Sequence, residues 1–268
     1  MTKYRKGKGK IFDPKSVEPF RISRTKIDLF LGCPRCFYLD QRLGVKRPDT
    51  YPLTLNLAVD ALLKKEFDLH RAKQTAHPMM KKYGLDALPF KHEKINSWRE
   101  LDFGRGGIHH WHQETNFDVY GVVDDVWITP KKELVVVDYK ATAKVAAPTL
   151  EGELGAQYKR QMEVYQWLLS KNDFKVSPIG YFVYVNGRRD AAAFDGRLEF
   201  EVSILPCEGD PRWIPKALDE MKQTLLAPAP PQSSADCDFC LYRQAAGLAL
   251  SAVPVGGVYP QTGQVALW

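Results

Sequence analysis

Two short stretches decide the fold: G-V-V-D-D at residues 121–125 and L-V-V-V-D-Y-K at residues 134–140. The run of valines in the second stretch is typical of a strand that is buried on both faces, so it predicts the central strand of a sheet. Pro, Lys and Lys at residues 130–132 lie between the two stretches and predict a turn. We therefore expect residues 117–129 and 133–139 to form two antiparallel strands.

Charged side chains follow the central strand at its exit. Residues two apart in a strand point to the same face, so Asp138 and Lys140 should project together, while Tyr139 points to the other face. Asp124 precedes Asp138 by about the length of a hairpin, and the two carboxylates could therefore meet at one edge of the sheet. Such a pair suits a hard cation such as Mg²⁺. The alternative is an ordinary salt bridge at the rim of the sheet.

A third acid lies upstream, in a segment with helical character. Residues 55–63 are apolar except for Asn56 and Asp60. A carboxylate in so apolar a segment needs a partner. Asp60 is therefore a candidate third metal ligand, and the alternative is a paired or partly exposed acid.

The cysteines form two C-x-x-C pairs, Cys33 with Cys36 and Cys237 with Cys240. Each pair can supply two thiolates to one centre, and four sulfurs suit Zn²⁺ or an iron–sulfur cluster. On the residues alone Zn²⁺ is favoured, and the absence of any metal is the remaining alternative. Cys207 lies outside both pairs and is expected to be a buried thiol.

Composition places the chain among globular proteins, with 268 residues, 44% hydrophobic and 26% charged. Of its net charge of +6, the first fifty residues hold thirteen Lys and Arg against five Asp and Glu. A local basic region of this kind attracts phosphate backbones or anionic lipid head groups, although the first ten residues could also be a solvated tail. The sequence has neither a secretory signal nor an apolar membrane span, so we expect a cytoplasmic protein that does not bind membranes.

The order of expected elements predicts an α/β fold with a mixed central sheet flanked by helices. Helices are expected at 24–31, 53–70, 156–170 and 213–226. Strands are expected at 108–115, 117–129, 133–139, 179–185 and 197–205. Four regions follow: a basic lead-in (1–20), a helical region (21–107), a core of sheet and helix (108–205) and a C-terminal helix with cysteines (206–268). Three histidines, expected at a solvated strand rim and not in a metal site, are His109, His110 and His112.

Several of these motifs occur together in one known pattern. The chain contains G-V-V-D at 121–124, V-V-D-Y-K-A-T at 136–142 and Gln161-x-x-x-Tyr165, preceded by Ser23…Phe30…Cys33-Pro34…Phe37-Tyr38-Leu39. From about Ser23 to Arg243 it resembles the PD-(D/E)XK nuclease superfamily, and in particular its RecB-like branch. The resemblance implies a restriction-endonuclease-like core.

Position by position, the resemblance also implies roles. Asp124 and Asp138 match metal-binding acids, Lys140 matches the catalytic lysine, and Gln161 and Tyr165 match a helix motif that lines the DNA channel. Asp60 stands where the branch usually has a histidine as its first metal ligand. Because this exchanges a neutral ligand for an anion, Glu66 is kept as the alternative.

The cysteines depart from the pattern of the branch. CRISPR-associated and AddB-type members hold a 4Fe–4S cluster with one N-terminal and three C-terminal cysteines, whereas Cys33 and Cys36 here pair with Cys237 and Cys240. The resemblance favours an iron–sulfur cluster, with Zn²⁺ as the alternative. Either would join the two ends of the chain as a metal clasp.

The combined expectation is a Mg²⁺- or Mn²⁺-dependent DNA nuclease, expected to be an exonuclease in DNA repair, recombination or defence. Its substrate would be single-stranded DNA or duplex ends, and proteins of a repair or CRISPR adaptation complex are candidate partners. One alternative is a nucleic-acid-binding module that has lost cleavage and keeps a structural zinc or iron–sulfur site. The other is a structural zinc protein that bridges other proteins.

Overall fold

The structure is a computed structural model that describes residues 10–48, 54–100 and 106–251. Residues 1–9 of the expected basic lead-in and residues 252–268 of the expected C-terminal region lie outside the described residues, as does the first residue of the helix expected at 53–70. No helix in the described part of the chain is long and apolar enough to cross a membrane.

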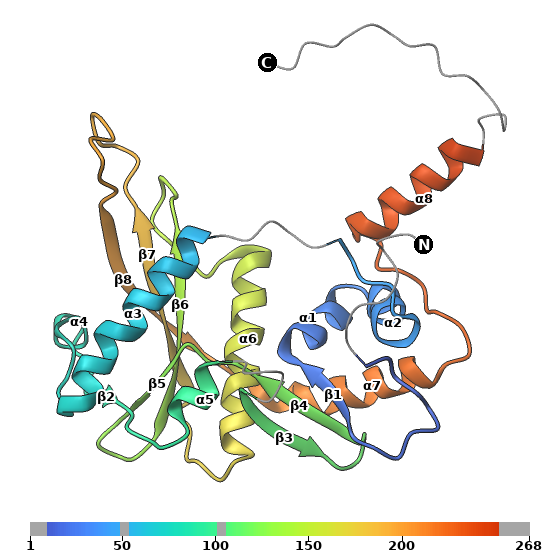
Figure 1. The fold of residues 1–268 in the computed structure, drawn as a ribbon, viewed down its shortest axis with the longest axis horizontal. Coiled ribbons are helices and arrows are strands. Elements are labelled where there is room, and N and C mark those ends of the chain that lie inside the picture. The colour runs from blue at the N-terminus through green and yellow to red at the C-terminus, as the bar shows by residue number, and fades with distance from the viewer. Residues whose placement is uncertain (1–9, 49–53, 101–105, 252–268) are drawn as a thin grey trace, which may run out of the picture.

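Figure 1 shows the helices and strands. The helices are α1 (Arg24–Gly32), α2 (Pro34–Leu43), α3 (Thr54–Lys73), α4 (Pro78–Lys82), α5 (Ile95–Arg99), α6 (Gly152–Ser170), α7 (Ile214–Leu226) and α8 (Asp238–Ser251), with a short 3₁₀ turn, η1 (Pro211–Trp213). The strands are β1 (Phe20–Ser23), β2 (Leu88–Pro89), β3 (Ile108–His112), β4 (Phe117–Gly121), β5 (Asp125–Ile128), β6 (Leu134–Thr142), β7 (Ile179–Gly187) and β8 (Phe200–Glu208).

The larger sheet has the strand order β2-β5-β6-β7-β8, which places β6 at its centre as predicted. β6 pairs antiparallel with β5, with Asp125 opposite Val137, and parallel with β7, with Asp138 opposite Phe182. The sheet is therefore mixed, and helices cover it. This confirms the predicted α/β class, and the predicted turn at 130–132 connects β5 to β6.

The strand expected at 117–129 is wrong as one continuous element. It breaks at residues 122–124, so that β4 belongs to a smaller sheet of order β1-β4-β3 and β5 belongs to the larger one. The backbone N–H of Val123 does not pair with a neighbouring strand of either sheet. It donates a hydrogen bond to the carbonyl of Trp98, with an N···O distance of 3.1 Å. The chain passes from one sheet to the other at this point, and Asp124 is the residue immediately before β5.

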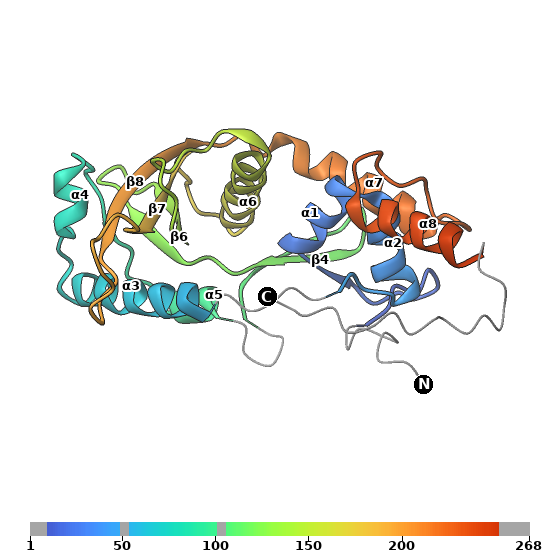
Figure 2. The ribbon, with the colours of Figure 1, turned by 90° about the horizontal axis from the view of Figure 1, so that it is seen from above.

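The core is divided by the central strand. Val136 packs in a cluster with Met162 and Leu168 of α6, whereas Val135 and Val137 pack in a second cluster on the α3 side. Figure 2 shows α3 and α6 on opposite sides of β6. Both faces of β6 are therefore covered, and its charged residues lie at its C-terminal end. The candidate site is located there.

Other elements differ from the sequence expectations mainly at their ends. α6 begins at Gly152 and not at 156, and β8 occupies 200–208 where 197–205 was expected. Six elements were not expected: β1, α2, α4, β2, α5 and α8. α2 starts with Pro34 at its first turn, where proline is tolerated because that N–H has no helical partner. The division of the chain into four regions stays a prediction.

Candidate active site and metal centre

The end of β6 separates its charged and aromatic side chains as alternation predicts. Asp138 is buried and forms an ion pair with Lys140, and both point toward α6. Tyr139 points to the α3 side, where its hydroxyl donates to Asp125 Oδ2 at 2.9 Å. The strand thus delivers one carboxylate and one ammonium group to the same place.

Asp124 reaches the same place from the start of β5. Its Oδ2 accepts a hydrogen bond from the backbone N–H of Tyr139 at 2.8 Å. Because Tyr139 follows Asp138 in β6, this bond holds the Asp124 carboxylate next to Asp138. Burial and the negative charge of Asp138 together raise the pKa of Asp124 to about 8. The two acids are therefore close enough to repel each other when both are ionised.

Gln161 of α6 links the acid to the amine. Its Nε2 donates to Asp138 Oδ1 at 2.6 Å and to the Tyr165 hydroxyl at 3.1 Å, and its Oε1 accepts from Lys140 Nζ at 3.2 Å. Gln161 and Tyr165 lie one turn apart and share a helix face, as their spacing predicted. Burial raises the pKa of Tyr165 to about 12, so this phenol stays neutral.

Aromatic rings surround the Lys140 ammonium. Its Nζ lies 4.6 Å from the ring centroid of Tyr158 on α6 and 5.7 Å from that of Phe182 on β7. Cation–π attraction from both rings stabilises the charged amine and limits its movement. Tyr158 therefore helps to position Lys140, a contact that the sequence analysis did not identify because it depends on the relative placement of α6 and β6.

Asp60 and Asp124 lie on either side of Lys64, which the sequence analysis also missed. Lys64 Nζ is 2.9 Å from Asp60 Oδ2 and 3.9 Å from Asp124 Oδ1. The Lys64 ammonium thus lies between Asp60 and Asp124. Glu66, the alternative ligand, pairs instead with His77 Nε2 at 2.9 Å, at the first turn of α4.

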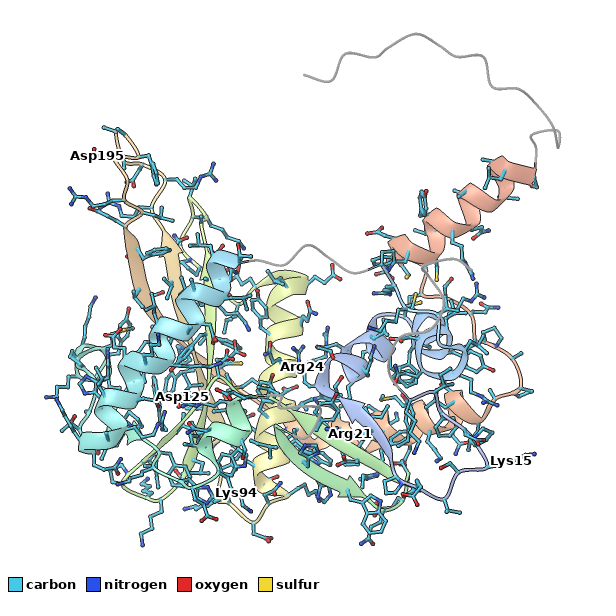
Figure 3. All side chains as sticks on the ribbon, viewed as in Figure 1. Lys15, Arg21, Arg24, Lys94, Asp125 and Asp195 are labelled. Atoms are coloured by element: carbon cyan, nitrogen blue, oxygen red, sulfur yellow. The ribbon has the colours of Figure 1, made fainter. Side chains whose placement is uncertain are left out.

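The neighbouring acid, Asp125, has a different environment from Asp124. It is fully buried, forms an ion pair with Arg71 of α3 and accepts a hydrogen bond from Tyr139. Asp68 continues this network by pairing with both Arg71 and Arg99, at 2.9 Å each. Figure 3 labels Asp125, which lies beside α3. These charges satisfy one another, so the network stabilises the fold beside the candidate site.

The carboxylates have the chemistry that a divalent ion requires. Asp138 Oδ2 is buried and, apart from its ion pair with Lys140, receives no well-formed hydrogen bond from the described residues. Asp124 is held near it with a raised pKa. A bound Mg²⁺ or Mn²⁺ would offset the repulsion between the two acids and bond to Asp138 Oδ2. Asp124 and Asp138 therefore fit such an ion. Asp60 contacts Asp124 only through Lys64, and among the described residues the three acids do not form a cluster with metal-ligand spacing.

The four predicted cysteines form a second cluster, remote in sequence and adjacent in space. The Sγ atoms of Cys33 and Cys240 are 3.8 Å apart, those of Cys36 and Cys237 are 3.7 Å apart, and those of Cys36 and Cys240 are 3.6 Å apart. All four side chains are buried, and their sulfur atoms lie within 4.8 Å of one another. The predicted clasp between residues 33/36 and 237/240 is thus confirmed as a four-cysteine cluster.

The surroundings of the cluster shift the pKa values of three of its thiols in different directions. Burial raises the pKa of Cys240, and it raises that of Cys36 to about 12. Burial acts in the same direction on Cys33, but backbone N–H groups of Cys36 and Ser234 outweigh it and lower the pKa of Cys33 to about 6. The Arg47 guanidinium donates to Cys237 Sγ at 3.3 Å and brings a positive charge to the cluster. The donor set therefore fits a metal that binds thiolates.

The sulfur separations bear on the kind of metal group. Four thiolates bound to one tetrahedral ion at about 2.3 Å lie about 3.8 Å from one another. The thiolates of a four-iron cluster bind four different iron atoms and must lie farther apart. Three of the six separations, 3.6 to 3.8 Å, are close to this value, and all four sulfur atoms lie within 4.8 Å of one another.

The remaining sequence candidates have ordinary partners. Cys207 is buried, as expected. His109 pairs with Asp118 at 3.2 Å on the smaller sheet, which fits a strand rim. His112 differs from the expectation, because it is buried with its Nδ1 2.9 Å from Thr115 Oγ1. Among the described residues, no histidine belongs to a cluster with metal-ligand spacing.

Three comparisons relate this chain to known proteins. A search of curated proteins gave no match. The solved structure described as "Crystal structure of SSO0001" aligns with 91% of this chain and 90% of its own, at 15% sequence identity and a TM-score of 0.39. The family model described as the PD-(D/E)XK nuclease superfamily matches residues 21–245, which contain both the acid cluster and the four cysteines. By this match the chain belongs to the PD-(D/E)XK nuclease superfamily.

Proposed function

We propose that this protein is a metal-dependent DNA nuclease of the RecB-like branch that hydrolyses phosphodiester bonds. The observation that carries the proposal is the meeting of Asp124 and Asp138 beside Lys140, with a buried oxygen of Asp138 left without a well-formed hydrogen bond. Superfamily membership supports it independently. Asp124 and Asp138 would hold Mg²⁺ or Mn²⁺, with Asp60 as a third ligand. When bound, the ion lowers the pKa of a water molecule and polarises the phosphodiester.

The side chains of this protein supply the rest of the reaction environment. The Lys140 ammonium, confined by Tyr158, is placed to stabilise the negative charge that develops on the phosphate. Gln161 holds Asp138 and Lys140 in a fixed relative position, because its Nε2 donates to Asp138 and its Oε1 accepts from Lys140. The excess of basic residues among the first fifty favours contact with the DNA backbone.

We further propose exonuclease action on single-stranded DNA or duplex ends, in repair, recombination or defence. This part rests on the resemblance to the RecB-like branch. Circular DNA tests it, because a strict exonuclease degrades linear DNA and leaves covalently closed circles intact.

For the cysteine centre we propose one tetrahedral ion, Zn²⁺, that joins the two ends of the described chain. The sulfur separations support it, whereas the resemblance favours an iron–sulfur cluster. Elemental analysis of protein purified without oxygen decides between them. One equivalent of zinc in colourless protein supports the single ion, and a brown protein with about four irons and four sulfides would replace it with a cluster.

The nuclease proposal is tested by cleavage of end-labelled linear DNA in Mg²⁺ and in Mn²⁺. Asp138→Asn and Lys140→Ala should each lower the cleavage rate by at least about 100-fold, the scale of losing one charge-stabilising group. Lys175→Ala is the matched control, because Lys175 forms an exposed pair with Glu133 away from the site. Wild-type rates in either site variant would refute the assignment. DNA binding without any cleavage by the wild-type protein would instead support the inactive binding module.

A further inference from the structure

Helix α1 brings two basic side chains of different elements together near the candidate active site. Arg24 is the first residue of α1, and its Nη1 donates to Asp28 Oδ2, one turn later, at 2.6 Å. On α6, Nε of Arg160 lies 3.3 Å from the other oxygen of Asp28. A single carboxylate thus holds two guanidinium groups between α1 and α6.

This cluster has an excess of positive charge and an unused donor. Two guanidinium groups face the carboxylate of Asp28, and the next anion, Asp138, is already paired with Lys140, so the group as a whole carries an excess of positive charge. The Asp28 side chain is only 9% exposed, whereas that of Arg160 is 32% exposed, so the arginine edge of the cluster is the part that meets solvent. Arg24 Nε is buried and has no hydrogen-bond partner. A buried donor of this kind requires an acceptor that the described residues do not supply.

The cluster also lies next to the acid centre, which is the pair Asp124 and Asp138. Asp138 and Tyr165 are both close enough to act electrostatically on the Arg24 guanidinium. Tyr165 is in turn bonded through Gln161 to Asp138. Figure 3 shows Arg24 on the side of α1 that faces α6. A ligand bound by Arg24 would therefore sit beside the group that Asp124 and Asp138 bind.

We propose that Arg24 and Arg160 form a phosphate-binding site that holds a DNA backbone phosphate next to the acid centre. Arginine suits this ligand because its planar fork of N–H groups matches two phosphate oxygens. The phosphate would bind to the exposed parts of both side chains, since 19% of Arg24 and 32% of Arg160 are exposed, and the anion would neutralise the excess charge. The inference rests on the proposed function for its ligand, but not on cleavage. The alternative is that the cluster only ties α1 to α6.

The test is DNA binding without cleavage, measured by fluorescence anisotropy of a labelled single-stranded oligonucleotide at several salt concentrations. Ca²⁺ replaces Mg²⁺, gels confirm that the oligonucleotide stays intact, and chelators are avoided because they would strip the cysteine centre. Arg24→Ala and Arg160→Ala should each weaken binding on the order of 10-fold and lower the salt slope by about 0.7, the effect of one lost phosphate contact. Arg212→Ala is the matched control, since Arg212 pairs with Asp210 outside the site.

A second set of variants separates binding from folding. Arg24→Lys keeps the charge and loses the fork, so its salt slope should stay at the wild-type value while its affinity falls a few-fold. Should Arg24→Ala fail to fold, Arg160→Ala and Arg24→Lys decide the question. Wild-type affinity and slope in both would overturn the inference and leave the nuclease proposal standing. Conversely, arginine-dependent binding by a protein that never cleaves DNA would keep this site and remove the nuclease proposal.

Discussion

Two adjacent aspartates should respond in opposite ways to the same substitution. Asp124 has a pKa of about 8, well above the value of about 3.9 for an unfolded chain, because burial and Asp138 disfavour its charge. Between about pH 4 and pH 8 the unfolded state therefore binds fewer protons than the folded state, and this group lowers stability as the pH rises. Asp125 is fully buried but paired with Arg71, so its charge is compensated.

The magnitudes follow from these environments. At pH 7 the unfolded-state pKa of Asp124 lies about 3 units below the pH, which corresponds to at most about 4 kcal/mol of lost stability. Asp124→Asn removes that titration and keeps an acceptor for the backbone N–H of Tyr139, so it should stabilise the protein when divalent ions are absent. Asp125→Asn replaces the buried anionic partner of Arg71 with an uncharged one. It should lower the free energy of unfolding by about 3 to 5 kcal/mol.

Urea unfolding of the two variants and the wild type, at pH 5 and pH 8, measures both effects. The wild type should be less stable at pH 8 relative to Asp124→Asn than at pH 5, and added Mg²⁺ should stabilise the wild type but not Asp124→Asn. Asp125→Asn should lose stability at both pH values and keep its response to Mg²⁺. Equal destabilisation by both substitutions, or an unchanged Mg²⁺ response in Asp124→Asn, would refute the reasoning.

Three further predictions concern packing, positioning and the metal clasp. Gly121→Ala should cost about 1 to 3 kcal/mol in urea unfolding, because a Cβ there would lie 2.7 Å from Cε1 of the Tyr165 ring; no loss would show that the ring moves aside freely. Gln161→Ala should lower the cleavage rate about 10- to 100-fold in protein that still folds, since the amide that orients the acid and the amine is lost; an unaltered rate would remove its positioning role. Cys237→Ser should abolish stoichiometric metal content and lower the melting temperature, whereas Cys207→Ser should retain the metal; equal metal content in both variants would contradict the four-cysteine centre.

The central strand and its charged exit could be predicted because both depend on local pattern. The valine run of β6 specifies a strand buried on both faces, and alternation then fixes the directions of Asp138, Tyr139 and Lys140. The turn at 130–132 is likewise local. The C-x-x-C pairs could be matched to each other because four thiolates suit one centre, whatever the distance between them in the sequence.

Other parts of the candidate site depend on tertiary packing that no local pattern encodes. The break at 122–124 resembles a continuous strand in sequence, since both halves are rich in β-branched and aromatic residues. Lys64 and Tyr158 each lie on a helix, and only the packing of α3 and α6 against β6 brings them to the acids and to Lys140. The sequence predicts Arg24 only as the first residue of a helix, whereas its proposed role depends on the contact between Asp28 and Arg160 of α6.

The central claim is that Asp124 and Asp138 share one divalent ion beside Lys140. Its most direct test is anomalous X-ray diffraction from crystals of the full chain soaked in Mn²⁺. We predict one strong Mn²⁺ peak bonded to a carboxylate oxygen of each aspartate, and no peak at that position in crystals of Asp124→Asn. A peak bonded to neither carboxylate, or no Mn²⁺ at this edge of the sheet at saturating concentration, would contradict the account.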